Sequence, residues 1–168
     1  IGFDTAEFLA HNPDHKPTSL SKEEFFHEWG VDTTYKNAGA LKSKEKIKSH
    51  REITLIQRKT SKHGKNLGKT TGWIHRQSLK DKGIKMIGGV EYKEINSSGL
   101  VIEIDGNQKT LEVDNIIICA GQTSVNKLYN EFDENESRPS YLIGGALKAS
   151  EIDAKRAIDE GVRLAYKI

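Results

Sequence analysis

The chain has 168 residues and carries 26 lysines and arginines against 24 acidic residues, a formal net charge of +2. This length suffices for one well-cored domain and barely for two, and the near-neutral balance is no indication of nucleic-acid binding. A single cysteine, Cys119, excludes an internal disulfide. Since no apolar stretch reaches the roughly 20 residues that cross a bilayer, we expect a cytoplasmic protein.

Two short helices are predicted first in chain order. Apolar residues over 1–9 follow the spacing of one helix face from the very start. We therefore expect a chain cut from a longer protein, in which Gly2 is the last glycine of a G-x-G-x-x-G turn. Residues 11–21 are rich in proline and polar residues, which predicts a loop. Ser21, with a glutamate three positions on, forms a capping box for a helix over 22–29.

The central stretch joins a short strand to a basic loop. Residues 53–56 are apolar or β-branched and predict a buried strand, which is followed by Arg58 and Lys59. Ligands of open α/β sheets lie beyond the carboxyl ends of the strands, where a cation accommodates the 2′-phosphate of NADP(H) and an acid bonds the unsubstituted ribose. No acid lies between positions 58 and 80. This favours NADP(H) over NAD(H); the alternative is two solvated cations at an exposed strand end.

The segment 64–70, GKNLGKT, is similar to a P-loop but fails its spacing. A Walker A loop needs four residues between its glycines, and here they enclose three. An ATPase or GTPase is therefore disfavoured, although Lys69 and the amides at the start of the next helix can still bind phosphate. That helix is predicted over 70–82, with Trp73 and Leu79 facing inward.

An antiparallel meander is predicted next, set into the α/β frame. A short strand is expected over 84–87, and the three strands of the meander are expected over 90–95, 99–105 and 109–113, with polar turns between them. Residues 115–121, NIIICAG, form a continuous apolar run that predicts a strand buried on both faces. Cys119 would then be a buried, inert thiol. The C-terminal residues predict an acidic loop over 132–139, a strand over 141–143, a turn at Gly144-Gly145 and an amphipathic helix over 152–166.

Several segments together resemble the C-terminal part of bacterial NADPH-dependent 2,4-dienoyl-CoA reductase. They are IGFDTA at 1–6, LGKTTGWIHR at 67–76, NIIICAGQ at 115–122, and LIGG at 142–145 followed by EIDAKRAI at 151–158. The resemblance covers essentially the whole chain. It implies an α/β, Rossmann-like FAD/NAD(P)-binding domain whose central parallel sheet has an inserted antiparallel β-meander and is truncated at its N-terminus. It also implies an NAD(P)H-binding subdomain over 1–121, lacking its first strand, and a FAD-contacting segment over 122–168.

Full-length members of this family join an old yellow enzyme-type barrel with FMN, an iron–sulfur cluster, and a module that binds FAD and NADPH. Hydride passes from NADPH to FAD, and electrons then reach FMN through the cluster. The resemblance therefore implies an oxidoreductase of fatty-acid β-oxidation in which this chain binds NADPH for hydride transfer to FAD. Its partner is the barrel of the same polypeptide. The chain alone is expected to be inactive and to carry no catalytic residue.

The cofactor-binding residues follow from the strand-end cations and from the resemblance. Gly2 ends the glycine turn of the NADPH site, and Ala146 and Leu147 stand where many relatives place an aspartate for the flavin ribityl chain, so backbone contacts are expected there. The full set of expected cofactor-binding residues is Gly2, Arg58, Lys59, Lys69, Trp73, Ala120, Gly121, Gln122, Gly144, Gly145 and Asp153.

Two alternatives stay open. One is a non-catalytic module that binds an acidic partner through residues 46–76, which hold nine lysines and arginines and one acid. Only Trp73 interrupts this basic stretch, whereas stacking platforms for nucleic acid need several aromatics. The other is a related flavin reductase with another substrate. The six histidines show no ligand spacing, so no metal is expected, and neither nucleic acid nor membrane is an expected partner.

Overall fold

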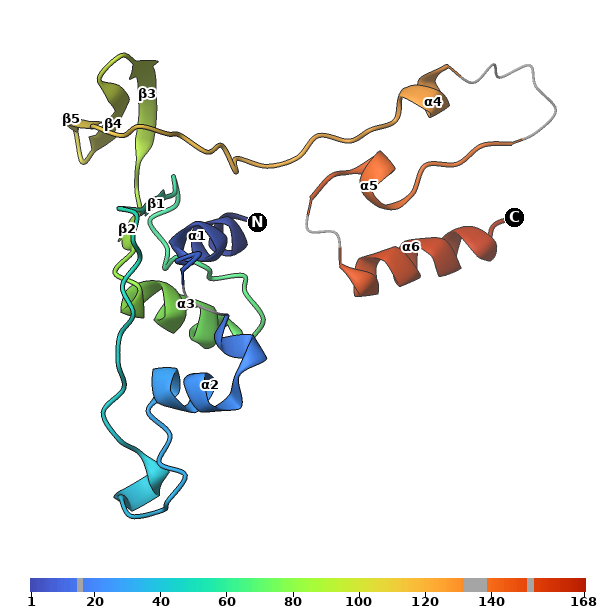
Figure 1. The fold of residues 1–168 in the computed structure, drawn as a ribbon. Coiled ribbons are helices and arrows are strands. Elements are labelled where there is room, and N and C mark those ends of the chain that lie inside the picture. Colours follow the sequence, from blue (N-terminus) through green and yellow to red (C-terminus); the bar gives the residue numbers. More distant parts are fainter. Residues whose placement is uncertain (15–16, 132–138, 151–152) are drawn as a thin grey trace. The chain divides into compact units, whose positions relative to one another are not determined.

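The computed structural model describes residues 1–14, 17–131, 139–150 and 153–168, in two compact units over 1–117 and 118–168 (Figure 1). The acidic loop predicted over 132–139 lies outside the described residues except for its last position. The assignment of residues 1–121 to NAD(P)H and of 122–168 to FAD stays a prediction. Among the described residues, no helix is long and apolar enough to cross a membrane.

The helices of the first unit follow local sequence signals. They are α1 (Gly2–Ala10), the 3-10 helix η1 (Thr18–Leu20), α2 (Lys22–Trp29), the 3-10 helix η2 (Ala38–Ala40) and α3 (Gly72–Asp81). The side chain of Ser21 accepts a hydrogen bond from the amide of Glu24 at 3.3 Å, and Gly30 ends α2 with a φ of 65°. This confirms the predicted start and end of α2.

Two small sheets complete the first unit. β1 (Thr54–Ile56) pairs in parallel with β2 (Lys85–Ile87). The antiparallel meander consists of β3 (Glu91–Asn96), β4 (Gly99–Ile104) and β5 (Asn107–Leu111), paired in that order. The predicted strand before the basic loop and the meander are therefore confirmed, and the fold is mixed α/β. A single parallel pair does not establish a Rossmann domain.

β1 and β2 contribute to two cores, because successive side chains of a strand point to opposite faces. Leu55 and Met86 pack with α1 and α3 in a cluster whose buried members are Ala6, Ala10, Leu79 and Ile84. Ile56 and Ile87 face the meander, where Val90, Leu100 and Ile102 are buried. Contacts on both faces fix β1, and with it the position of its carboxyl end.

Two predicted strands are not formed. Residues 115–121 and 141–143 have no regular secondary structure, and Ile118 is 75% exposed. Cys119 is also exposed, so the prediction of a buried thiol is wrong. An apolar run becomes a strand only where a neighbouring backbone pairs with its amides and carbonyls. No strand in the described part of the chain pairs with either segment.

The predicted helix over 70–82 is confirmed by α3, but only one of its two predicted core residues is buried. Leu79 is fully buried, whereas Trp73 is 54% exposed, so the inward position predicted for Trp73 is wrong. Trp73 lies in the first turn of α3 and meets Trp29 of α2 in an edge-on contact, with 6.4 Å between ring centroids. A contact with one neighbouring ring leaves much of a large indole in solvent.

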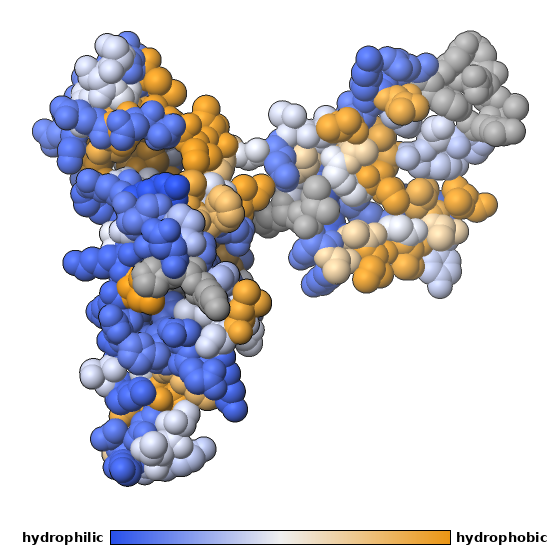
Figure 2. All heavy atoms as spheres, viewed as in Figure 1, coloured by the Kyte–Doolittle hydropathy of each residue, from blue (hydrophilic) through white to orange (hydrophobic). Residues whose placement is uncertain are grey.

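The second unit contains short helices and one longer helix. They are α4 (Lys127–Asn130), α5 (Gly144–Leu147) and α6 (Ala154–Ala165). Gly144 and Gly145, predicted as a turn, open the single helical turn α5 instead. The predicted amphipathic helix over 152–166 is confirmed by α6; residue 152 lies outside the described residues. Ile158 and Val162 of α6 are exposed, and apolar surface is visible on this unit in Figure 2.

Candidate functional site

The candidate site is the β1 loop, which we define as residues 57–69. It begins on a fixed backbone, because the amide of Gln57 donates to the Ile87 carbonyl at 3.0 Å and the Gln57 carbonyl accepts from the Val90 amide at 3.1 Å. These bonds tie the first residue of the loop to the end of β2 and to the turn after it. The loop therefore leaves β1 from a defined position at the carboxyl edge of the parallel pair.

The side chain of Gln57 folds the start of the loop. Its amide nitrogen Nε2 donates to the carbonyl oxygens of Lys59 at 2.8 Å and of Ser61 at 2.5 Å. The Lys59 carbonyl also accepts from the amide of Gly89 at 3.1 Å. Two carbonyls are thus directed at Gln57, while the side chains of Arg58 and Lys59 are exposed.

The turn at Gly88 and Gly89 comes close to the loop and leaves no room for side chains. A Cβ on Gly88 would lie 3.0 Å from the Lys59 carbonyl and 3.6 Å from Cε1 of His63. Gly89 has a φ of 71°, a conformation that favours glycine. Nε2 of His63 is buried and has no hydrogen-bond partner among the described residues. The two glycines let the end of β2 support the loop at close range.

The second half of the loop is held by α1 and α3. The Gly64 carbonyl accepts from the Leu67 amide and from the Arg76 guanidinium, each at 3.1 Å. A Cβ on Gly64 would lie 2.9 Å from Cζ of Phe3, which shows how closely the start of α1 packs on the loop. Gly2 precedes Phe3 as the first residue of α1, so the structure places this predicted cofactor residue near the basic loop.

The β1 loop is strongly positive. It contains no acidic residue, and its cations are exposed: Arg58, Lys59, Lys62, Lys65 and Lys69. None of the ion pairs found between described residues involves one of these five side chains. By contrast, Lys44 pairs with Asp81 at 2.5 Å elsewhere in the unit. Unpaired cations on a folded loop are donors of the kind that bind phosphate groups, so the loop is a candidate phosphate-binding site.

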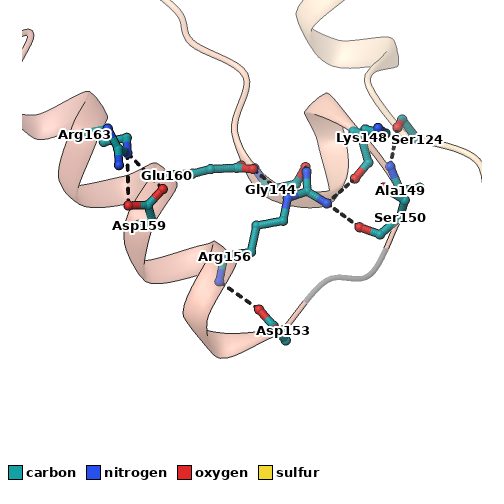
Figure 3. Close-up of polar contacts among 10 residues, drawn as sticks. All are labelled: Ser124, Gly144, Lys148, Ala149, Ser150, Asp153, Arg156, Asp159, Glu160 and Arg163. Atoms are coloured by element: carbon teal, nitrogen blue, oxygen red, sulfur yellow. Dashed lines mark hydrogen bonds and ion pairs between the residues drawn. The ribbon is translucent and has the colours of Figure 1, made fainter. Parts of the chain in front are cut away.

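A second polar cluster lies in the other unit and is centred on Arg156 (Figure 3). Its guanidinium donates to Oε1 of Glu160 at 2.6 Å and to the carbonyls of Gly144 at 3.1 Å, Lys148 at 2.9 Å and Ser150. Glu160 also accepts from the Gly144 amide. The hydrogen bonds from Arg156 and from Gly144 hold the pKa of Glu160 below its usual range. Arg156 thereby joins α6 to the segment around α5.

The hydrogen bonds of this cluster do not fit the binding of an anionic part of FAD at the predicted residue Gly144. The Gly144 amide already donates to the carboxylate of Glu160, which would repel a pyrophosphate. Asp153 is also engaged, because its Oδ1 accepts from the Arg156 amide at 2.8 Å as the N-cap of α6. A neutral contact of the flavin with Gly145 stays a prediction.

The remaining predicted residues, Trp73, Ala120, Gly121 and Gln122, are exposed and lie outside the β1 loop. Trp73 follows the loop, at the start of α3, with Trp29 against it. Ala120, Gly121 and Gln122 lie in the irregular segment that opens the second unit, where Gly121 has a φ of 126°. Their roles as cofactor contacts stay predictions.

Sequence reasoning missed the side chains whose hydrogen bonds hold the β1 loop and the Arg156 cluster together. Gln57 carries no pattern signal, because an isolated glutamine after a strand is common and its two acceptors are set by the loop conformation. Arg156 and Glu160 could have been paired from their i,i+4 spacing, but the contacts of Arg156 to the α5 segment could not.

Two known proteins to which this chain is similar are named as reductases. No known family model matches the chain. A metal reductase from Desulforamulus reducens is 27% identical over 108 residues, which cover 63% of this chain and 16% of that protein. The structure of a 2-naphthoyl-CoA reductase with 2-naphthoyl-CoA is similar with a TM-score of 0.58 and 22% identity, over 70% of this chain and 18% of that one. The chain thus spans about a sixth of the length of each.

Proposed function

We propose that this chain is the nicotinamide-binding part of a larger NADPH-dependent reductase, and that Arg58 and Lys59 bind the adenosine 2′-phosphate of NADPH. The observation that carries this proposal is the position of the two cations. They are exposed and unpaired among the described residues, on a folded loop at the carboxyl end of the parallel strand β1. That edge is where open α/β sheets bind nucleotides.

The chain's own residues would act by binding and orientation. The Arg58 guanidinium can donate two parallel hydrogen bonds to a phosphate, and the Lys59 ammonium adds a second charge. Lys62, Lys65 and Lys69 raise the local positive potential, which attracts a polyanionic cofactor. When bound, NADPH supplies a hydride, and the role of these residues is to hold and orient it.

The proposed parent enzyme is a 2,4-dienoyl-CoA reductase, an oxidoreductase of the CH–CH class that reduces a carbon–carbon double bond of an unsaturated acyl-CoA. Two observations support an enzyme of this kind: the sequence resemblance over essentially the whole chain, and a fold shared with a reductase solved with a CoA ester. The Rossmann-like fold, the further cofactors FAD, FMN and an iron–sulfur cluster, and a role in fatty-acid metabolism belong to the same proposal. Substrate choice would reside in the part of the enzyme outside these residues.

Isothermal calorimetry with adenosine 2′,5′-bisphosphate and with ADP tests the 2′-phosphate assignment. These probes need only the adenosine end of the site, so the test is independent of where the nicotinamide lies. We expect the 2′-phosphorylated probe to bind roughly tenfold or more tightly, with an affinity that falls as salt rises. Arg58→Ala with Lys59→Ala should abolish the preference. Equal binding of both probes to the unaltered chain would overturn the proposal.

A matched control separates this effect from a general loss of positive charge. Lys36→Ala with Lys109→Ala removes the same two charges from exposed positions outside the β1 loop. The control should keep the preference for the 2′-phosphorylated probe. If both double variants lose it equally, binding depends on net charge rather than on Arg58 and Lys59.

One observation favours the alternative of a module that binds an acidic partner. Trp29 and Trp73 meet edge-on, and the Lys44 ammonium lies 5.4 Å from the ring centre of Trp29. Partly exposed aromatics beside cations can stack nucleic-acid bases. Quenching of the tryptophan fluorescence by a single-stranded oligodeoxythymidine, lost in Trp73→Ala, would support this alternative; no quenching at low salt would exclude it.

A further inference from the structure

We infer that Gln57 is a positioning residue for cofactor specificity: its side-chain amide folds the β1 loop so that Arg58 and Lys59 are presented together to a 2′-phosphate. This inference rests on the proposed function and deepens it, because it explains how two flexible side chains can discriminate one phosphate.

Gln57 is rigid on its backbone side. Its amide and its carbonyl are both bonded, to Ile87 and to Val90, and its side chain is half-buried. The side chain of Gln57 therefore extends from a backbone position that is fixed. The direction of its amide group is then set by its own two acceptors.

Those two acceptors curl the loop around the side-chain amide of Gln57. A glutamine amide nitrogen carries two hydrogens, and Nε2 of Gln57 lies within bonding distance of the carbonyls of Lys59 and of Ser61. Both carbonyls therefore point inward, toward Gln57. The Gly89 amide also donates to the Lys59 carbonyl. With its carbonyls held inside, the loop has its charged side chains exposed to solvent.

The conformation of the loop affects binding because arginine and lysine side chains lose much conformational freedom when they bind a ligand. A backbone already in the bound conformation reduces that cost. Without the Gln57 donors, the Ser61 carbonyl would lose this partner and residues 58–61 would sample more conformations. The expected consequence is weaker binding of the 2′-phosphate, with little change in contacts to the rest of the nucleotide.

The test is Gln57→Met, which keeps the length of the side chain and removes its donors. We expect affinity for adenosine 2′,5′-bisphosphate to fall roughly three- to thirtyfold, while affinity for ADP changes less than twofold. Gln77→Met is the matched control, since Gln77 on α3 also donates one side-chain hydrogen bond, to Asp81 at 3.0 Å. The control should leave both affinities unchanged. A residue with only a structural role would lower both affinities in parallel.

A second measurement needs no variant. In the unaltered chain, adding adenosine 2′,5′-bisphosphate should slow hydrogen exchange of the Gln57 side-chain amide and of the Gly89 backbone amide, both of which bond the Lys59 carbonyl. ADP should have a smaller effect. Unchanged exchange at both groups in the saturated complex would overturn the inference, as would full retention of the 2′-phosphate preference in Gln57→Met.

The outcomes separate this inference from the proposed function. If the unaltered chain shows no preference for the 2′-phosphorylated probe, the proposed function fails and the inference with it. If the preference exists and is lost in the Arg58, Lys59 double variant but kept in Gln57→Met, only the role of Gln57 is overturned.

Discussion

Ser78 of α3 donates a hydrogen bond to Oε1 of Glu7 of α1, at 2.9 Å. The same carboxylate lies 3.4 Å from Nδ1 of His75 and 3.7 Å from Nζ of Lys82. One residue of α1 thus contacts three positions along or next to α3. Because α1 also packs on Gly64 through Phe3, this contact helps to hold the frame on which the β1 loop rests.

Replacing Glu7 with alanine should destabilise the first unit. We expect a loss of roughly 1 kcal/mol in the free energy of unfolding, because the partly buried Ser78 hydroxyl loses its acceptor. Both tryptophans lie in the first unit, so urea unfolding followed by tryptophan fluorescence reports this unit alone. Glu112→Ala, at an exposed position, is the control. Equal midpoints for the two variants would contradict the prediction.

Asp32 should make the first unit sensitive to acid. It is 5% exposed and accepts from the hydroxyl and amide of Thr34 and from the amide and side chain of Asn37. The bond from the Thr34 hydroxyl, followed by those from the Asn37 and Thr34 amides, holds the pKa of Asp32 well below its usual range. Its carboxylate therefore stabilises the fold above its unfolded pKa of about 3.9, and this stability is lost as pH falls.

The variant Asp32→Asn tests this dependence, because asparagine has one acceptor oxygen where aspartate has two. It should be less stable than the unaltered chain at pH 7, and the difference should shrink as pH falls below about 4. Urea unfolding at several pH values between 7 and 3 measures it. A difference that stays constant over this range would show that the charge of Asp32 is not responsible.

Two glycines of the meander should differ in their tolerance of alanine. Gly99 and Gly106 both have positive φ, 127° and 78°. A Cβ on Gly99 would lie 2.1 Å from the Leu111 carbonyl oxygen, whereas a Cβ on Gly106 would meet no described neighbour within 4 Å. Gly106→Ala should cost about 1–2 kcal/mol, the cost of a left-handed conformation. Gly99→Ala should cost more, because the β4–β5 pairing must also shift. Thermal unfolding compares the two, and a larger loss in Gly106→Ala would refute the prediction.

The second unit depends on the shape of the Arg156 guanidinium. Arg156→Lys keeps the charge but cannot reach Gly144, Lys148 and Glu160 at once, since lysine lacks the planar fork. We expect faster hydrogen exchange at the Gly144 amide, which bonds Glu160. Arg163→Lys is the control, because Arg163 contacts the neighbouring Asp159 at an exposed site on the same helix. Equal exchange rates in the two variants would contradict this role for Arg156.

In the candidate site, the position of Arg58 and Lys59 at a strand end could be predicted from the sequence. The conformation of the loop that carries them could not. Arg58 and Lys59 follow an apolar run, and the end of such a run marks the carboxyl edge of a strand in any α/β sheet. The bonds from Gln57 to Lys59 and Ser61 depend on the path of the loop, which is set by its contacts with Gly88 and Gly89 some 30 residues away in sequence. No local pattern encodes such a contact.

By itself the sequence determined the features that depend on neighbours along the chain. The Ser21 N-cap of α2, its glycine stop, the hairpin turns of the meander and the amphipathic pattern of α6 each act within a few residues, and each forms as predicted. Tertiary structure decided the rest. Residues 115–121 have the composition of a buried strand, yet all of them except the partly buried Ile116 are exposed, and Trp73 is half exposed. The physical reason is that strand pairing and burial each need a second surface from elsewhere in the chain. A sequence pattern describes only the segment that carries it.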